Sequence, residues 1–423
     1  MKRMLSVIVI LLSTTAHARI YIPVNQPSDK KLPIAIPDLV GGGFGEDVAE
    51  IIRNDLTLSG YFQVITPEIY EKRAREEGTT LETIQFNYWQ TIEAHALVKG
   101  EVQGSRGKLS VSLRLFDPYA PEMIVGKEYQ AGSGDIREIA HRFADEIMEA
   151  LTGRRGVFNT KITYAMVTNK KQREVYIMDM DGERARAVTK LRSMSLSPAW
   201  SPDGSHLVFT SYTKGRPDLY TIGVDGRGLK RLTENQGANL TPVWSPNGER
   251  IIYASSETGE AELYSISPDG ANRRRLTQTM GIDLSPDFSP DGSEVVFASE
   301  RSGNLHVFKM SVHGGATQRL TYVGYQNDLP EWSPLADKIA FSGRDSGTFD
   351  IFIMNPDGSN IQRLTIRSGS NEHPTFSPDG RFIAFQSTRD GTTAIYLMRA
   401  DGSNQTRISK HNGMLPQWGP RVE

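Results

Sequence analysis

Apolar and polar positions recur with a period of 44 residues over the C-terminal two thirds of the chain. An aromatic residue followed by Ser-Pro marks five of the copies, at Trp200, Trp244, Phe288, Trp332 and Phe376. A hydroxyl residue that follows an apolar residue keeps the same step, at Thr189, Thr233, Thr277, Thr321, Thr365 and Ser409. A fixed period of this length indicates a repeat architecture.

Each copy carries the pattern of four short strands. A Pro-Asp-Gly turn, as at residues 202–204, connects two antiparallel strands because Pro presets φ and Gly accepts a positive φ. The strand that follows, with Leu207, Val208 and Phe209, is apolar on both faces, as a strand stacked between two sheets requires. A third strand is expected at residues 219–224, and a short fourth strand ends at Leu232-Thr233. Four strands in about 44 residues are typical of a propeller blade.

The ends of the repeat region predict six blades. The first copy begins at Ile162 without the Trp-Ser-Pro strand, and the chain ends with an unaccompanied copy of that strand around Trp418. If the last strand pairs with the first copy, the ring closes and no strand edge is exposed at the seam. We therefore expect an all-β, six-bladed propeller over residues 161–423.

Residues 33–153 do not show the 44-residue repeat. Their pattern predicts a small α/β domain, joined to the propeller by a linker at residues 154–160. Strands are expected at residues 33–37 and 62–66, and an antiparallel meander at residues 96–103, 108–116 and 123–130. Two helices have apolar residues at helical spacing, one beginning near Phe44 and one running from Ile136 to Leu151, before Gly153. The Gly-rich segment 41–45 lacks the other parts of a phosphate-binding motif and is interpreted as a strand-to-helix turn.

The first 18 residues have the features of a signal peptide. Lys2 and Arg3 precede an apolar run at residues 5–12, and Ala16-His17-Ala18 supplies a small-residue cleavage site. The apolar run is too short to cross a bilayer, which needs about 20 residues. Residues 19–32 are then expected to form a flexible N-terminal segment.

Composition and charge exclude only a few classes of partner and of chemistry. The 48 basic and 50 acidic residues give a net charge of −2, which argues against nucleic acid as a partner. No other stretch reaches transmembrane length, so no direct membrane insertion is expected. The chain has no cysteine and therefore neither disulfides nor thiolate chemistry, which is compatible with a periplasm-type compartment. We expect no cofactor.

The repeats agree in their cores and differ just ahead of the first proline of each motif, where the chain enters the innermost strand. Loops at these positions converge on one mouth of a propeller channel, and variation there is typical of a site built on a constant scaffold. The candidate partner-binding residues at this mouth are Ser197, Asn239, Thr241, Asp283, Ser285, Asp328, Glu372, His373 and Asn412. Polar and acidic groups around a concave mouth could accept a peptide.

Plainer interpretations exist for the same residues. Asp283, Asp328 and Glu372 could each cap a local turn, and for any single residue this is the favoured interpretation. The three acids could also bind Ca²⁺, but the chain has no recognised Ca²⁺ motif and we expect no metal. His373 is the one group at the mouth that could titrate near neutral pH, although a lone loop histidine is more often a hydrogen-bonding residue.

Two enzyme classes are alternatives to a binding protein. A prolyl-peptidase-like hydrolase needs a second full domain with a G-x-S-x-G elbow, and the chain has neither. A periplasmic carbohydrate lyase or hydrolase built on a propeller remains the alternative, and a lyase would need several histidines around a metal. Only His373 and His411 approach the mouth, so we expect no catalytic residues and no enzymatic activity.

The W-S-P-D-G repeats, the signal peptide, the leading α/β domain and the six-blade count together resemble the TolB family, and the resemblance covers essentially the whole mature chain. It implies a periplasmic, non-enzymatic adaptor of the Tol–Pal system. It also implies that the lipoprotein Pal binds over the channel mouth, with other outer-membrane lipoproteins as further candidate partners. Contact with TolA is implied through the N-terminal segment, which here begins with Arg19, Ile20, Tyr21 and Ile22. The implied role is outer-membrane integrity and invagination during division, and some bacteriocins use the same propeller site.

Overall fold

The computed structural model describes residues 31–105, 107–345 and 347–422, which form two compact units. One unit contains the N-terminal sheet, and the other contains the repeat region together with residues 54–60 and 138–145. The predicted signal peptide and the residues Arg19–Ile22 lie outside the described residues. None of the helices in the described ranges is both long and apolar enough to span a bilayer.

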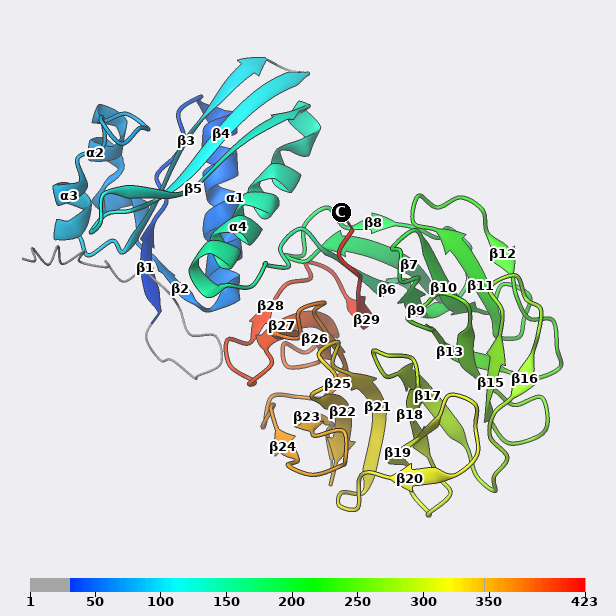
Figure 1. Ribbon diagram of the computed structural model, residues 1–423. Helices are drawn as coiled ribbons and strands as arrows, with labels where there is room; N and C mark the ends of the chain where they lie inside the picture. Colours follow the sequence, from blue (N-terminus) through cyan, green and yellow to red (C-terminus); the bar gives the residue numbers. More distant parts are fainter. Residues whose placement is uncertain (1–30, 106, 346, 423) are drawn as a thin grey trace, which may run out of the picture. The chain divides into compact units, whose positions relative to one another are not determined.

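The N-terminal region is an α/β fold around a five-stranded sheet (Figure 1). Its strands are β1 (Leu32–Ala35), β2 (Phe62–Val64), β3 (Ala96–Ser105), β4 (Lys108–Asp117) and β5 (Glu122–Ala131), in the spatial order β2-β1-β3-β4-β5. Its helices are α1 (Gly43–Ser59), α2 (Glu71–Glu76), α3 (Phe86–Thr91) and α4 (Ile136–Thr152), with 3-10 turns η1 (Pro67–Ile69) and η2 (Ser133–Asp135).

Most of these elements confirm the pattern of apolar positions. Val48 and Ile52 of α1 and Ile147 and Leu151 of α4 are fully buried, and Gly153 ends α4 with a φ of 71°. A residue at the helix C-terminus adopts this left-handed conformation most easily when it is glycine. The pattern did not predict α3, whose six residues are too short to show a helical period.

The repeat region forms six four-stranded sheets arranged in a ring (Figure 1), which confirms the predicted six-bladed propeller. Two sheets consist of β9 (Ser195–Trp200), β10 (His206–Ser211), β11 (Asp218–Gly223) and β12 (Lys230–Arg231), and of β13 (Asn239–Trp244), β14 (Ile251–Ser255), β15 (Glu262–Ile266) and β16 (Arg274–Arg275). The next two consist of β17 (Asp283–Phe288), β18 (Glu294–Ser299), β19 (His306–Ser311) and β20 (Thr317–Arg319), and of β21 (Gln326–Trp332), β22 (Ile339–Arg344), β23 (Asp350–Met354) and β24 (Gln362–Arg363). The last two consist of β25 (Asn371–Phe376), β26 (Phe382–Ser387), β27 (Ala394–Arg399) and β28 (Thr406–Arg407), and of β29 (Gly413–Trp418), β6 (Lys161–Asn169), β7 (Gln172–Asp179) and β8 (Arg186–Ala187).

The last sheet closes the ring as the chain ends predicted. Strand β29 pairs antiparallel with β6, with Trp418 opposite Ile162. The Trp418 side chain is 6% exposed, and its indole N–H donates to Thr160 Oγ1 at 2.7 Å. The first and last strands of the propeller therefore share one sheet, and neither leaves an open edge at the seam.

The hydrophobic cores of the propeller lie between adjacent sheets. One cluster joins Ile252 and Leu263 of one sheet to Phe297 and Phe308 of the next, all of them buried. Both faces of each middle strand are consequently buried, which explains why the strands lack a polar face. Burial of apolar area is the main stabilising contribution in such a stack.

A polar clasp recurs at the outer half of the sheets and accounts for the repeated threonine. In the sheet formed by β21–β24, Asp350 at the start of β23 accepts hydrogen bonds from Arg363 Nε at 3.0 Å, Thr365 Oγ1 at 2.6 Å and Asn371 Nδ2 at 3.1 Å. Thr365 in turn accepts from the backbone N–H of Ile351 at 3.0 Å. Asp218 and Glu262 occupy the same place in two other sheets, so the clasp ties the short outermost strand to the body of its blade.

Candidate functional site

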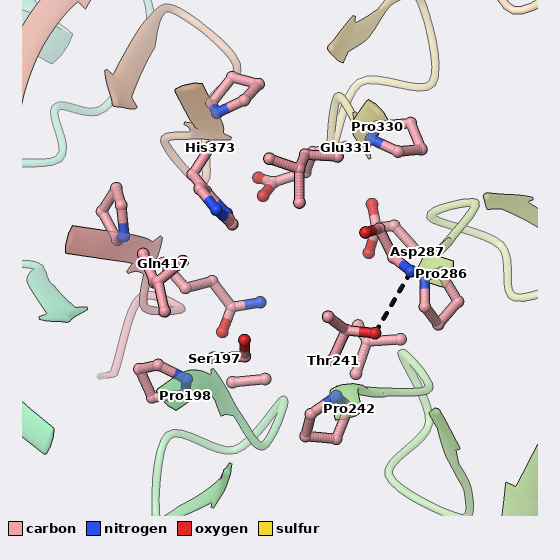
Figure 2. Close-up of a pocket in the computed structure, with 17 residues that line it drawn as sticks. Ser197, Pro198, Thr241, Pro242, Pro286, Asp287, Pro330, Glu331, His373 and Gln417 are labelled. Atoms are coloured by element: carbon pink, nitrogen blue, oxygen red, sulfur yellow. Dashed lines mark hydrogen bonds between the residues drawn. The ribbon is translucent and has the colours of Figure 1, made fainter. Parts of the chain in front are cut away.

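One opening of the central channel is lined by the residues that precede the repeat prolines, together with those prolines and the residues that follow them. The opening encloses about 100 Å³, and Figure 2 shows side chains from different blades pointing toward its centre. The residues that precede the prolines are Ser197, Thr241, Ser285, Leu329, His373 and Leu415. Each comes from the innermost strand of a different blade, so six equivalent positions meet at one point.

All six of these residues have a left-handed backbone, with φ between 48° and 56°. None of them is glycine, and a side chain in this conformation costs about 1–2 kcal/mol. Strain of this kind persists only when the surrounding structure holds it, and it is concentrated at functional sites. The six-fold repetition marks the opening as a built feature of the ring.

The left-handed residue belongs to a bulge in the innermost strand. Pairing of β13 with β14, for example, is interrupted between Leu240 and Val243, which leaves Thr241 and Pro242 outside the ladder. Proline has no backbone N–H, so its presence at a bulge removes no ladder hydrogen bond. The bulge re-aims the preceding side chain toward the channel, which a regular strand would not do.

Neighbouring side chains accept hydrogen bonds from the backbone N–H groups of the left-handed residues. The Ser285 N–H donates to Thr241 Oγ1 at 3.3 Å, as Figure 2 shows, and the Leu329 N–H donates to Asp328 Oδ1 at 2.6 Å. The His373 N–H donates to Ser342 Oγ at 3.1 Å. Two of the predicted mouth residues, Thr241 and Asp328, therefore also maintain the backbone of the opening.

The structure brings together four of the predicted mouth residues, namely Ser197, Thr241, Ser285 and His373. Asp328 and Glu372 lie one position earlier and are half-buried. Asp328 hydrogen-bonds Ser285 of the adjacent blade, and Glu372 Oε1 accepts from Ser370 Oγ at 2.7 Å. Asn412 is exposed in the loop before β29.

The prediction for Asn239 and Asp283 needs correction. Both side chains are fully buried at the start of their strands, so a partner cannot contact them. Asn239 Nδ2 donates to Asn235 Oδ1 at 2.8 Å, and Asp283 accepts from Arg301 at 2.9 Å. The reason is positional, because two residues separate each of them from the proline and the bulge lies between.

A second ring of residues, two positions further along each innermost strand, was not predicted from the sequence. Five of the six residues directly after the repeat prolines line the channel at and around its constriction: Ala199, Val243, Asp287, Glu331 and Gln417. The sixth, Thr375, is fully buried. The sequence did carry a signal for these positions, because the residue between the constant proline and the constant aromatic residue varies from repeat to repeat. Beyond them the channel widens into a chamber of about 450 Å³ walled by the repeated aromatic residues and prolines.

Polar members of this ring join consecutive blades. Asp287 Oδ2 accepts from the Trp332 N–H at 2.7 Å, and Glu331 Oε1 accepts from the Phe376 N–H at 2.7 Å and from Thr375 Oγ1 at 2.8 Å. Thr375 Oγ1 accepts from the Trp418 N–H at 3.0 Å, and Gln417 Oε1 accepts from the Trp200 N–H at 2.7 Å. Four of the six junctions between blades therefore have a side-chain bond at the channel wall.

The channel is electrostatically unusual because half-buried carboxyl groups lie along its wall. Burial raises the pKa of Asp287 to about 7, against the effect of the hydrogen bond from Trp332. Burial, and then the charge of Asp287, raises the pKa of Glu331 well above its usual range. Burial also raises the pKa of Asp328 and lowers the pKa of His373 to about 3. His373 is therefore neutral near pH 7 and is unsuited to sensing pH in that range.

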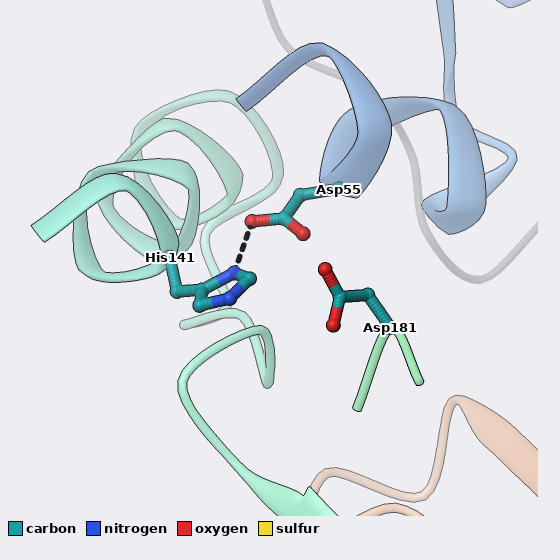
Figure 3. A group of neighbouring side chains, drawn as sticks. All are labelled: Asp55, His141 and Asp181. Atoms are coloured by element: carbon teal, nitrogen blue, oxygen red, sulfur yellow. Dashed lines mark hydrogen bonds and ion pairs between the residues drawn. The ribbon is translucent and has the colours of Figure 1, made fainter. Parts of the chain in front are cut away.

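One cluster of side chains in the described part of the chain has the composition of a metal site. The one group of three or more candidate ligand residues found there within mutual reach is Asp55, His141 and Asp181, which lie in the same compact unit (Figure 3). His141 Nδ1 is 2.7 Å from Asp55 Oδ2, which is a hydrogen bond between the two side chains. This bond accounts for the position of the histidine, and the group does not involve the channel.

Family models match almost the whole chain. A model described as the TolB beta propeller domain matches residues 148–422, and one described as the TolB amino-terminal domain matches residues 20–123.

Curated proteins and solved structures give the same result. The Tol-Pal system protein TolB of Desulfosudis oleivorans is 36% identical over 227 residues, which is 51% of this chain and 52% of the relative. That of Syntrophotalea carbinolica is 37% identical over 216 residues, 49% of this chain and 50% of the relative. The match spans about half the length of these relatives. The crystal structure of TolB from Acinetobacter baumannii covers 93% of this chain and 98% of its own, with a TM-score of 0.81 and 26% identity.

Proposed function

The chain belongs to the TolB family, and from that premise we propose that it is a non-enzymatic adaptor of the Tol–Pal system in the periplasm. The adaptor binds the peptidoglycan-associated lipoprotein Pal, and other outer-membrane lipoproteins as further candidates, over the channel opening. It links this complex to the inner-membrane protein TolA through its N-terminal segment. The outcome is outer-membrane integrity and invagination of that membrane during division.

The observation that supports binding at the opening is the convergence of six left-handed residues on one point. Ser197, Thr241, Ser285 and His373 present polar groups there, while Leu329 and Leu415 present apolar groups. The backbone of the opening is fixed by hydrogen bonds, so little conformational entropy is lost when a partner binds. A mixed polar and apolar rim on a pre-formed concave surface suits a protein segment.

Filling the opening tests this proposal. We expect Thr241→Arg together with Ser285→Arg to weaken binding of the soluble Pal domain at least about 100-fold, because the long side chains occupy the opening and carry charge into it. Isothermal titration calorimetry with the mature chain measures the change.

The matched control is Asn272→Arg. Asn272 also has a left-handed backbone, with a φ of 53°, but it lies in the exposed turn between β15 and β16. We expect this variant to bind Pal within about twofold of the wild type. Unchanged binding by the Thr241/Ser285 variant would exclude the opening as the binding site.

The N-terminal segment has a separate test. Deletion of Arg19–Ile22 from the mature chain is expected to reduce binding of the periplasmic domain of TolA at least about tenfold, because three of the four residues are apolar or aromatic and suit an anchoring contact. Binding of the Pal domain, measured on the same preparation, serves as the control. Full retention of TolA binding would place that contact elsewhere on the chain.

A further inference from the structure

Large apolar side chains are exposed unevenly around the loops that enter the innermost strands. Tyr322, Val323 and Tyr325 in the loop from β20 to β21 are 71%, 66% and 56% exposed. The corresponding loops of the two adjacent blades expose Met280, at 93%, and Ile366, at 62%. Single exposed apolar residues are ordinary, but a set on three consecutive loops of one face marks an interaction surface.

The other three loops of this face are polar at the same repeat position. The residue that follows the repeated Thr or Ser is Tyr322 or Ile366 in two of the apolar loops and Gln278 in the loop that exposes Met280, whereas it is Lys190, Glu234 or Lys410 on the opposite side. These three charged residues are exposed. The scaffold is the same in all six blades, so packing of the blade does not explain the difference.

Two arginines flank the aromatic loop, and no carboxylate of the described residues lies within ion-pair distance of either. The Arg319 guanidinium lies 4.9 Å from the ring centre of Tyr322, and its Nε donates to the Thr321 carbonyl. The Arg344 guanidinium lies 5.6 Å from the ring centre of Tyr325, and its terminal nitrogen donates to Gln326 Oε1 at 2.8 Å. By contrast, Arg275 and Arg363, which occupy the position of Arg319 in the two adjacent blades, pair with Glu262 and Asp350.

We infer that Tyr322, Val323 and Tyr325, with Arg319 and Arg344, form an off-centre docking surface for a protein segment that carries acidic next to apolar side chains. This inference rests on the proposed function, because it names the part of the face on which the partner over the opening is anchored. Tyrosine and arginine are enriched among the residues that supply most of the binding energy at protein interfaces. The unpaired guanidinium groups supply the charge that an acidic segment complements.

The distance from the opening supports one continuous footprint. Leu329 at the opening lies four positions after Tyr325, which is about 13 Å along a strand. An ordinary protein interface covers about 800 Å² on each partner, which corresponds to a radius of about 16 Å. A partner centred over the opening therefore reaches the aromatic loop without an enlarged interface.

The experiment compares two sides of one face in the mature chain, with the soluble Pal domain as the probe. Tyr322→Ser with Tyr325→Ser is expected to weaken binding at least about tenfold. Arg319→Glu is expected to slow association, and this effect shrinks between about 50 mM and 500 mM salt because exposed charges are screened. The matched control, Lys190→Ser with Glu234→Ser at the equivalent polar loops, is expected to stay within about twofold.

The outcomes separate this inference from the proposed function. If Thr241→Arg/Ser285→Arg abolishes binding and Tyr322→Ser/Tyr325→Ser leaves it unchanged, the docking surface is wrong and the proposed function stands. If the wild type does not bind the Pal domain, the proposed function itself is wrong. If the tyrosine variant loses binding to isolated peptidoglycan but keeps binding to the Pal domain, the surface serves a glycan and the inference is overturned.

Discussion

Replacing Asp350 with alanine is expected to lower the free energy of unfolding by about 3–5 kcal/mol, because the buried donors of Thr365 and Asn371 lose their common acceptor and the exposed Arg363 loses its ion pair. Asp350 is 1% exposed, so water cannot replace the carboxylate. Asp350→Asn keeps one acceptor oxygen and is expected to lose less, about 1–2 kcal/mol. Urea unfolding followed by tryptophan fluorescence measures both changes.

The chain provides its own comparison for this clasp. The equivalent position in the next blade is Ala394, where Ser409 Oγ donates to the His411 carbonyl at 3.0 Å instead of to an acid. A blade can therefore be built without the acid when its donors have other partners. Exposed Glu260 serves as the control, since Glu260→Ala is expected to change stability by less than about 0.5 kcal/mol. A loss below about 1 kcal/mol for Asp350→Ala would show that the clasp is dispensable.

The carboxyl pair at the channel constriction is expected to make stability fall as the pH rises. The folded state raises the pKa of Asp287 to about 7 and raises that of Glu331 as well, whereas both groups titrate near pH 4 in the unfolded chain. The folded protein therefore holds a proton that the unfolded chain releases. The stabilising contribution is complete below about pH 4 and is lost as the pH rises toward 7.

Removing the charge while keeping the hydrogen bonds isolates this effect. Asp287→Asn with Glu331→Gln retains carbonyl oxygens that accept from the Trp332 and Phe376 N–H groups. Relative to the wild type, the variant is expected to gain about 1–3 kcal/mol of unfolding free energy between pH 5 and pH 8. The measurement is urea unfolding at several pH values.

The control for the pH experiment is Asp291→Asn in the turn of the same blade. Hydrogen bonds from Ser289 and Ser293 lower the pKa of Asp291 to about 2, so this group is ionised throughout the range. Its effect on stability is expected to be the same at pH 5 and pH 8. A difference between wild type and the Asp287/Glu331 variant that does not change with pH would mean that the two carboxyls do not share a retained proton.

Four of the six residues that precede the repeat prolines at the opening were among the candidates from the sequence, because variation ahead of a constant motif is visible in one sequence. Leu329 and Leu415, which complete the ring, were not among them. Asn239 and Asp283 were included wrongly, and Asp287 and Glu331 were missed, because the bulge at the left-handed residue changes which side chains face the channel. A non-glycine residue with positive φ has no sequence signal as strong as glycine would provide.

The sequence by itself determined the repeat, the number of blades and the closure of the ring around Trp418. These properties follow from periodic positions of aromatic, turn and hydroxyl residues, which are local and are therefore visible along the chain. Only the tertiary structure decided which residues from different blades meet at the channel, which carboxyls have a raised pKa there, and which loops expose Tyr322 and Tyr325. Those properties depend on contacts between blades, where neighbours in space are about 44 residues apart in the chain.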